Sequence, residues 1–280
     1  MPSFDTPAAI SALTRVEAGS LQFVAGDRAD TVVTVAPRNP KKDLDVRTAA
    51  QTEVSYANGT LTVRTPKSNL FGRTGIVDVT MELPAGSRVE VDGAWTQVLG
   101  EGRFGEVRVK TSSGDARFDT TGPLHLTASH GSITVDRVEG AAEITTSSGS
   151  VRVGFVDGPA VLKNSAGTTT VGAVTGELRV SGAHGDITVD RAEDSVTATT
   201  AHGTVRVGEV ACGTVRLETN YGAIDVGIRE GTAAWLDAVS GSGQVRNGLA
   251  ASDAPEATEE TVKVHARTRH GNIDIRHARP

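Results

Sequence analysis

Apolar and polar residues alternate along most of the chain, and glycine interrupts the alternation at a nearly constant interval. Successive turn glycines are 17, 18, 18, 18, 18 and 19 residues apart, at Gly114, Gly131, Gly149, Gly167, Gly185, Gly203 and Gly222. Apolar residues follow most of them at the second and fourth positions, as in the pair Val205 and Val207. Because side chains alternate between the two faces of a strand, each such stretch predicts a strand with one buried face.

A second apolar pair in each repeat predicts a second strand, as at Ala142 and Ile144. Between the two strands lies a corner such as Asp136–Gly140, where valine can enter the core and glycine can take a positive φ. A repeat of this length cannot bury a core alone, but repeats stacked at about 4.8 Å can pair above and below. The pattern predicts an all-β fold, a single-stranded, right-handed β-helix or β-solenoid with two-strand coils of about 18 residues. A meander of sequential hairpins is the alternative, although the corners lack the Asn-Gly turns of tight hairpins.

The two ends of the chain depart from the regular repeat. Residues 1–90 predict wider, irregular coils that cap the solenoid, because a bare end exposes unpaired strand edges. Within them we expect a short helix over 41–51, a hairpin over 53–64 around Asn58-Gly59, and a strand over 76–83. Regular coils follow over 91–248, then an exposed loop over 249–260, and a final coil and tail over 261–280.

Several motifs resemble a bacterial β-strand-repeat family of unknown function whose members are labelled as adhesin candidates. They are the Thr-Ser-Ser-Gly-x-Val-x-Val coils, the late Arg269–Ile275 segment (RHGNIDI) and the lead-in Val79–Gly86 (VTMELPAG). The resemblance covers about residues 75–277 and implies a member of the actinobacterial type. It implies a single-stranded β-helix, with no catalytic residue and no cofactor.

The composition of the chain argues against several classes of ligand and of enzyme. A net charge of −6 does not favour binding to nucleic acid, and a single cysteine, Cys212, excludes an internal disulfide. The sequence has no basic, apolar leader and no membrane span, so we expect a cytoplasmic, bacterial protein. Turn acids such as Asp136 and Asp190 lie three coils apart, about 14 Å, which is too far for the paired carboxylates of a glycosidase.

One column of the repeat carries candidate chemistry. The residue before each turn glycine is histidine at His184 and His202 and tyrosine at Tyr221, so these side chains form a surface-ladder candidate. Two imidazoles could begin a metal site, but the flanking positions hold Ala166 and Tyr221, and a zinc site needs three or four ligands. We therefore predict a solvated corner there, and no catalytic, cofactor or metal site.

These observations favour a non-enzymatic scaffold whose long rigid face binds a protein partner or a second copy of the chain. The alternative is a binding module for a polysaccharide or another component of the cell envelope, as in adhesins. The sequence implies no cofactor, no nucleic acid and no membrane span.

Overall fold

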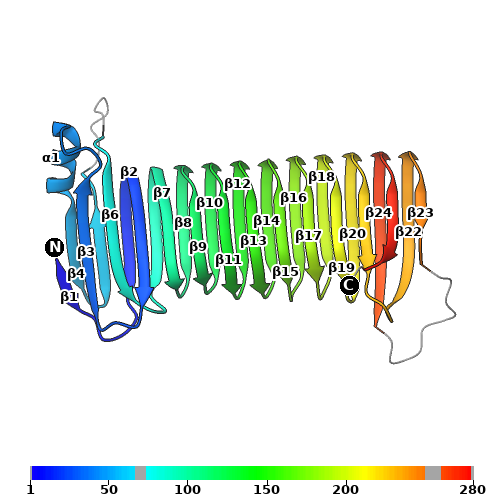
Figure 1. The fold of residues 1–280 in the computed structure, drawn as a ribbon, viewed down its shortest axis with the longest axis horizontal. Helices are drawn as coiled ribbons and strands as arrows, with labels where there is room; N and C mark the ends of the chain where they lie inside the picture. The colour runs from blue at the N-terminus through cyan, green and yellow to red at the C-terminus, as the bar shows by residue number, and fades with distance from the viewer. Residues whose placement is uncertain (1, 67–73, 250–259, 279–280) are drawn as a thin grey trace. The chain divides into compact units, whose positions relative to one another are not determined.

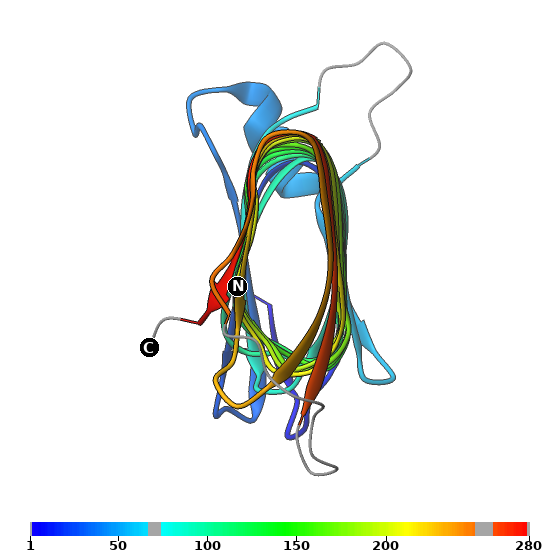
Figure 2. The ribbon, with the colours of Figure 1, turned by 90° about the vertical axis from the view of Figure 1, so that its right-hand side faces the viewer.

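The computed structural model describes residues 2–66, 74–249 and 260–278, and within them nearly every element is a β-strand. The chain forms two compact units, residues 1–139 and residues 140–280, here called the N-terminal unit and the C-terminal unit. Most of the loop expected over 249–260 lies outside the described residues. Seen end-on in Figure 2, the coils of each unit are flattened loops with two long sides.

The C-terminal unit confirms the two-strand coil. Its strands on one long side pair in parallel in the order β12, β14, β16, β18 and β20, and those on the other side in the order β13, β15, β17, β19 and β21 (Figure 1). Their bounds are Ala142–Ser148 (β12), Val151–Asp157 (β13), Ala160–Ala166 (β14), Thr169–Val174 (β15), Leu178–His184 (β16), Ile187–Ala192 (β17), Val196–His202 (β18), Val205–Val210 (β19), Gly213–Tyr221 (β20) and Ile224–Ile228 (β21). Four further strands are Ala233–Ser242 (β22), Val245–Asn247 (β23), Thr261–His270 (β24) and Ile273–His277 (β25).

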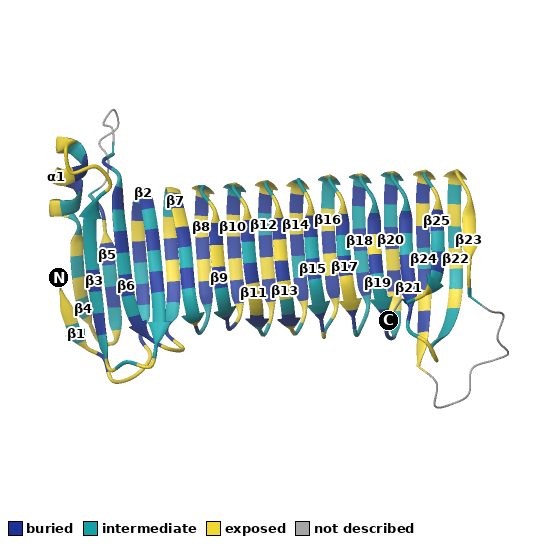
Figure 3. Cartoon of the chain, in the orientation of Figure 1, coloured by how far each residue is buried: buried dark blue, intermediate teal, exposed yellow. Residues whose placement is uncertain are grey.

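The alternation in the sequence becomes alternating burial along the strands from β12 to β21 (Figure 3). Val189, Val205 and Val207 are completely buried, and Val174 and Val210 fill the core at the corner, as the repeat predicted. These residues stack on equivalent residues of the neighbouring coils, so the core is a set of apolar columns. Burial of these columns is the main stabilising contribution of the unit.

The order of the last two coils differs from their order in the sequence. β24 pairs with β20 on one side and with β22 on the other, and β25 lies in the same way between β21 and β23. The final segment of the chain is therefore inserted between the coil of residues 213–228 and that of residues 233–247. The sequence pattern did not predict this insertion, because local alternation sets which face of a strand is buried and does not set which coil is the neighbour.

The turn that defines the repeat requires glycine. At Gly203 φ is +146°, and a Cβ atom there would lie 2.2 Å from the carbonyl oxygen of Gly185 in the preceding coil. Inward-facing hydroxyls complete the turn: Thr219 donates to the carbonyl of Gly203 over 3.0 Å. The neighbouring coils thus touch through backbone at this corner, and a side chain on the glycine would push them apart.

The N-terminal unit combines two-strand coils with two long strands that each run along both sides of a coil. Its elements are Ser3–Asp5 (β1), Ser11–Gly26 (β2), Asp30–Pro37 (β3), Asp43–Gln51 (α1), Glu53–Ala57 (β4), Thr60–Arg64 (β5), Val77–Pro84 (β6), Arg88–Arg103 (β7), Val107–Ser113 (β8), Ala116–Thr121 (β9), Leu124–His130 (β10) and Ile133–Glu139 (β11). β2 and β7 are 16-residue strands that pair with each other in parallel. β2 also pairs with β5 and β6, while β7 pairs with β8 and β9.

Antiparallel strands and a helix cover the coil formed by β5 and β6. β4 pairs with β5, β3 pairs with β6, and β1 continues the sheet beyond β3. The rings of Phe4 in β1 and Tyr56 in β4 lie 5.4 Å apart and link the two sides. The predicted hairpin is confirmed, with Asn58 and Gly59 at positive φ, and the predicted helix is confirmed as α1, which contacts β3 and β6.

A buried carboxylate attaches α1 to this unit. Asp45, in the first turn of the helix, has a side chain that is only 2% exposed. Its carboxylate accepts a hydrogen bond of 3.0 Å from the backbone N–H of Ile76 and forms an ion pair of 3.2 Å with Lys42. These contacts, the Ile76 bond first, lower the pKa of the Asp45 carboxyl and keep it charged at neutral pH.

Candidate binding surface

The candidate column forms one continuous ladder of rings in the C-terminal unit. It contains four side chains from four neighbouring coils, His184 in β16, His202 in β18, Tyr221 in β20 and His270 in β24. We call these four residues the ring ladder. The backbone fixes their register, because the N–H of each turn glycine donates to the carbonyl of the ring residue in the next coil, over 2.8 to 3.0 Å. The rings therefore repeat at the spacing of the strands.

The rings of the ladder stack face to face. Ring centres are 4.8 Å apart for His184 and His202, 5.0 Å for His202 and Tyr221, and 4.8 Å for Tyr221 and His270. The angles between ring planes are 20°, 6° and 12°. All four side chains are exposed. The ladder thus presents a row of ring edges to solvent on a rigid backbone.

The geometry of the ladder does not suit a shared metal ion. Zinc binds imidazole nitrogen in the ring plane at about 2.1 Å, so two parallel rings 4.8 Å apart cannot reach one ion without tilting. Within the described residues, no group of three or more His, Cys, Asp and Glu side chains is placed to hold a metal. The ladder instead offers stacking surfaces and hydrogen-bonding ring nitrogens.

The ladder has an open end beside His184. The next two residues of the column are Ala166 and Ser148, both too small to stack. One face of the His184 ring is stacked on His202, and no other ring in the described part of the chain stacks on its outer face. A planar group could therefore extend the ladder above Ala166, where the methyl group leaves room.

The sequence predicted part of this arrangement. His184 and His202 lie on adjacent coils as expected, and Tyr221 follows them in the column. The stacking of His270 on Tyr221 was missed, because 49 residues separate the two and an intervening coil was expected between them. One residue could have indicated that the coil of residues 233–247 lies at the end of the stack. Asn247 occupies an inward position, where its paired residue Ile275 is apolar, and a polar residue at this position is compatible with an end coil.

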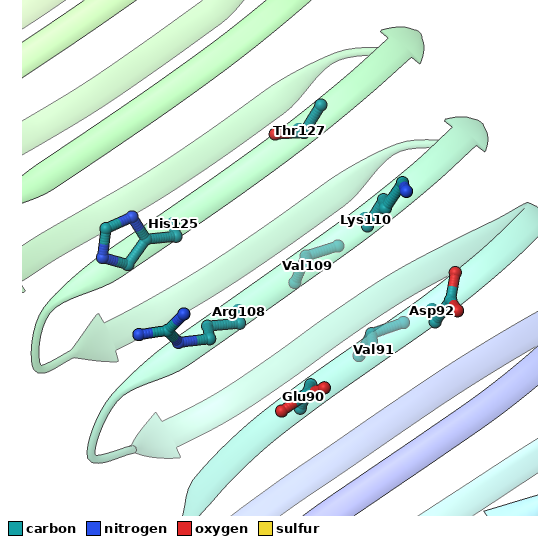
Figure 4. A pocket seen from close by; sticks show the side chains of 8 residues that line it. All are labelled: Glu90, Val91, Asp92, Arg108, Val109, Lys110, His125 and Thr127. Atoms are coloured by element: carbon teal, nitrogen blue, oxygen red, sulfur yellow. The ribbon is translucent and has the colours of Figure 1, made fainter.

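A second candidate is a shallow hollow on the N-terminal unit, shown in Figure 4. Its polar side chains stand on the outer face of three neighbouring strands, with acids on β7 and bases on β8 and β10: Glu90, Asp92, Arg108, Lys110, His125 and Thr127. Glu90 pairs in register with Arg108, and Asp92 with Lys110. Arg108 also donates to Glu106 over 2.6 Å, which lowers the pKa of the Glu106 carboxyl. Acids that face bases in this way balance surface charge and do not form the proton-donating carboxyl of a hydrolase.

The single cysteine offers no reactive thiol. Cys212 is half-buried, and its Sγ lies 3.2 Å from the carbonyl oxygen of Glu193. Burial and the nearby acids Glu260, Asp194 and Glu193 raise the pKa of the Cys212 thiol. A thiol with a raised pKa is mostly protonated at neutral pH and is a poor nucleophile. No helix in the described ranges is long and apolar enough to cross a membrane.

The sequence matches a known protein family. Residues 15–276 match the family described as Toastrack DUF4097. The chain belongs to the Toastrack DUF4097 family. The match extends over most of both units, in agreement with the β-solenoid fold and with the family resemblance seen in the sequence. No curated protein is similar in sequence to this Toastrack chain.

Solved structures similar to this Toastrack chain come from bacteria. A candidate adhesin from Parabacteroides distasonis is 14% identical, with a TM-score of 0.44, and covers 80% of this chain and 95% of its own. A candidate adhesin from Bacteroides fragilis is 16% identical, with a TM-score of 0.39, over 81% of this chain and 95% of its own. A candidate cell adhesion protein from Clostridium sporogenes is 10% identical, with a TM-score of 0.25, over 99% and 98%. Because these TM-scores are below 0.5, the family assignment rests on the family match.

Proposed function

We propose that this Toastrack chain is a non-enzymatic scaffold that binds a protein partner through the ring ladder. The observation that carries the proposal is the continuous stack of four exposed rings on four coils, fixed by backbone hydrogen bonds. Rigid, exposed aromatic groups are enriched at protein interfaces because they bury a large area at a small cost in conformational entropy. Self-association, the second expected mode of binding, would use a different surface.

The open end of the ladder indicates how a partner would engage it. A planar side chain of the partner, aromatic or guanidinium, would stack on the outer face of His184 above Ala166. The exposed ring edges of His202, Tyr221 and His270 would then form the continuation of the same contact. Stacking of this kind contributes about 0.5–1.5 kcal/mol per pair beyond the area that it buries.

Binding to a polymer of the cell envelope is the alternative function. The ladder repeats along the coils at the strand spacing, so an extended chain could follow it. Sugar rings, however, usually stack on open aromatic faces, and within the ladder the inner faces are already occupied by neighbouring rings. The geometry therefore favours a protein partner.

The test is affinity capture from a lysate of the source cell with three forms of the full chain. We expect the wild-type chain to retain one identified protein in stoichiometric amount, and the double variant His184→Ser with His202→Ser to lose it. The variant His125→Ser, which changes an exposed histidine of the other unit, is the matched control and should retain it. Retention of polysaccharide in place of protein would support the alternative, and equal retention by all three forms would exclude the ladder.

A further inference from the structure

The last coil of the C-terminal unit has unpaired strand edges. β22 pairs with β24 and β23 pairs with β25, and among the described strands of this unit neither has a partner on its other side. Figure 1 shows β22 and β23 as the final coil. We call these two strands the terminal edge. Their outward backbone N–H and C=O groups can accept another strand.

The apolar core is open at the same place. Val205, Ile224 and Ile273 form one inward column and are completely buried, whereas Val245, the next member of that column, is 45% exposed. On the other long side Leu236 continues the column of the buried Val264 but is only half-buried. The core thus ends in a layer that is covered on one side only, and a further coil would bury it.

Exposed apolar side chains gather at the terminal edge. Three of the six large apolar residues that are exposed in the described part of the chain belong to it, Trp235, Val239 and Val245. Proteins usually protect such an edge with lysine, proline or a covering segment. Residues 233–247 contain neither lysine nor proline.

The charges of the terminal edge would not repel a second copy. Asp237 forms an ion pair of 2.7 Å with Arg267 and contacts His265 at 3.3 Å, both on β24 of the same copy. Arg246 faces Asp274 at 3.8 Å. One acid and one base are the only charged residues of segment 233–247, so its formal charge is zero.

We propose that the terminal edge of one chain pairs with the terminal edge of a second copy. The edge carries unpaired strands on both long sides of the coil, so one extended peptide can satisfy only one of them. A second copy, related by a two-fold axis perpendicular to the sheets, places β22 against β22 and β23 against β23. Both pairs are antiparallel, and inward residues stay inward because the axis preserves the faces of each sheet.

The size of the coil agrees with a dimer of moderate stability. A 10-residue strand is about 33 Å long, and two sheets about 10 Å apart with their outer side chains are about 20 Å thick. The end of the coil therefore offers about 600 Å² per copy, slightly below the 800 Å² of a standard protein interface. This interface uses a different surface from the ring ladder and does not depend on the proposed partner.

The first test is sedimentation velocity on the full chain between about 1 and 100 µM. We expect a concentration-dependent dimer for the wild-type chain. The double variant Trp235→Lys with Val239→Lys should remain a monomer over this range, because the two-fold axis brings four lysines together. The matched control, Ser147→Lys with Ser181→Lys, adds the same charge at exposed sites on β12 and β16 and should still dimerise.

Circular dichroism must show the same strand content and melting temperature for both lysine variants, which separates lost pairing from lost folding. A wild-type chain that stays monomeric at 100 µM would overturn the proposal. Dimers that persist in the Trp235→Lys, Val239→Lys variant would overturn it as well, since they would use another surface.

A distance measurement tests the arrangement of the two copies. A spin label at Thr197→Cys, in a Cys212→Ser background, stands on β18, three strand spacings from β22 through β20 and β24. The two labelled positions of a two-fold dimer should then be about 34 Å apart, which is seven strand spacings. A clearly different distance would show that the copies meet elsewhere and would contradict pairing at the terminal edge.

Discussion

The outer coils of the two units are built in the same way but covered differently. In the N-terminal unit β2 is inserted between the coil of β5 and β6 and the strand β7, just as β24 and β25 are inserted next to β22 and β23 in the C-terminal unit. The coil of β5 and β6 is then covered by β3, β4, β1 and α1. The coil of β22 and β23 has no such cover among the described residues.

This comparison separates two requirements of a solenoid. A segment that is inserted as the second coil is held by strand pairs on both sides, so it cannot fray alone. The second requirement is a cover on the outermost coil. Without one, the last layer of the core and the last strand edges are exposed to solvent. The described residues of the N-terminal unit meet both requirements, whereas those of the C-terminal unit meet only the first, and the proposed second copy would meet the other.

The largest loss of stability should come from placing a carboxylate in an inward column of the core. We compare an interior position of that column with its position in the terminal edge. Val205→Asp would bury a carboxylate in a fully covered layer and should cost about 4 kcal/mol or more of unfolding free energy, enough to prevent folding of the unit. Val245→Asp, in the same column at the terminal edge, should cost about 1 kcal/mol or less, because its carboxylate reaches water. Chemical denaturation of both variants measures the difference, at a protein concentration below the range in which the proposed dimer forms.

Equal losses for Val205→Asp and Val245→Asp would contradict the open end. They would mean that the terminal coil is as well covered as the interior ones. Weak loss for both would instead contradict the register that points Val205 inward.

The second effect compares two glycines with positive φ. Gly203→Ala should cost about 2–4 kcal/mol, because its Cβ would meet the carbonyl oxygen of Gly185 at 2.2 Å in addition to the strain of the backbone. Gly231, in the turn before β22, has φ of +79°, and no atom lies within 4 Å of the place that a Cβ atom would take there. Gly231→Ala should therefore cost only the conformational strain, about 1 kcal/mol.

Thermal unfolding of both alanine variants distinguishes close contact between coils from strain alone. If the two variants melt at the same temperature, backbone crowding between neighbouring coils does not determine the choice of glycine at the repeat corner.

A smaller effect is expected for the cover of the N-terminal unit. Asp45→Asn keeps a hydrogen-bond acceptor for Ile76 but removes the charge, which should cost about 1 kcal/mol at neutral pH. The pKa of Asp45 is lowered in the folded protein, so its stabilisation is present above the unfolded value of about 3.9 and is lost as pH falls through the folded value. The difference between wild type and variant should therefore disappear in acid.

Hydrogen exchange of the α1 amides at pH 7 and at low pH provides the measurement. Asp43→Asn, an exposed acid of the same helical turn, is the control and should change exchange little. A difference between wild type and Asp45→Asn that persists unchanged in strong acid would show that shape, and not charge, holds the helix.

The contrast between interior and outer coils also explains what could be predicted from the sequence. Alternation and glycine spacing predicted the strands, their buried face and the adjacency of His184 and His202, because these depend on residues within one or two repeats. The insertion of β2 and β24 could not be predicted from the pattern. Every coil presents similar strand edges and a similar apolar core layer, so alternation does not specify which coil is the neighbour. The contact between Tyr221 and His270 was missed for the same reason.

The smallest effect should follow from removing two rings of the ladder. The double variant His184→Ser with His202→Ser copies the residue found at Ser148 of the same column. It loses the stack between the two histidines and the stack of His202 on Tyr221, but these rings are exposed and the turn is held by backbone bonds of Gly185 and Gly203. We therefore expect a loss of about 0.5 kcal/mol in unfolding free energy, less than the Asp45 change. Zinc at micromolar concentration should leave the melting temperature of the wild-type chain nearly unchanged, because two parallel rings cannot complete a coordination shell. A rise of many degrees with zinc that disappears in the double variant would show that the rings tilt toward a shared ion, and it would make the ladder a metal site.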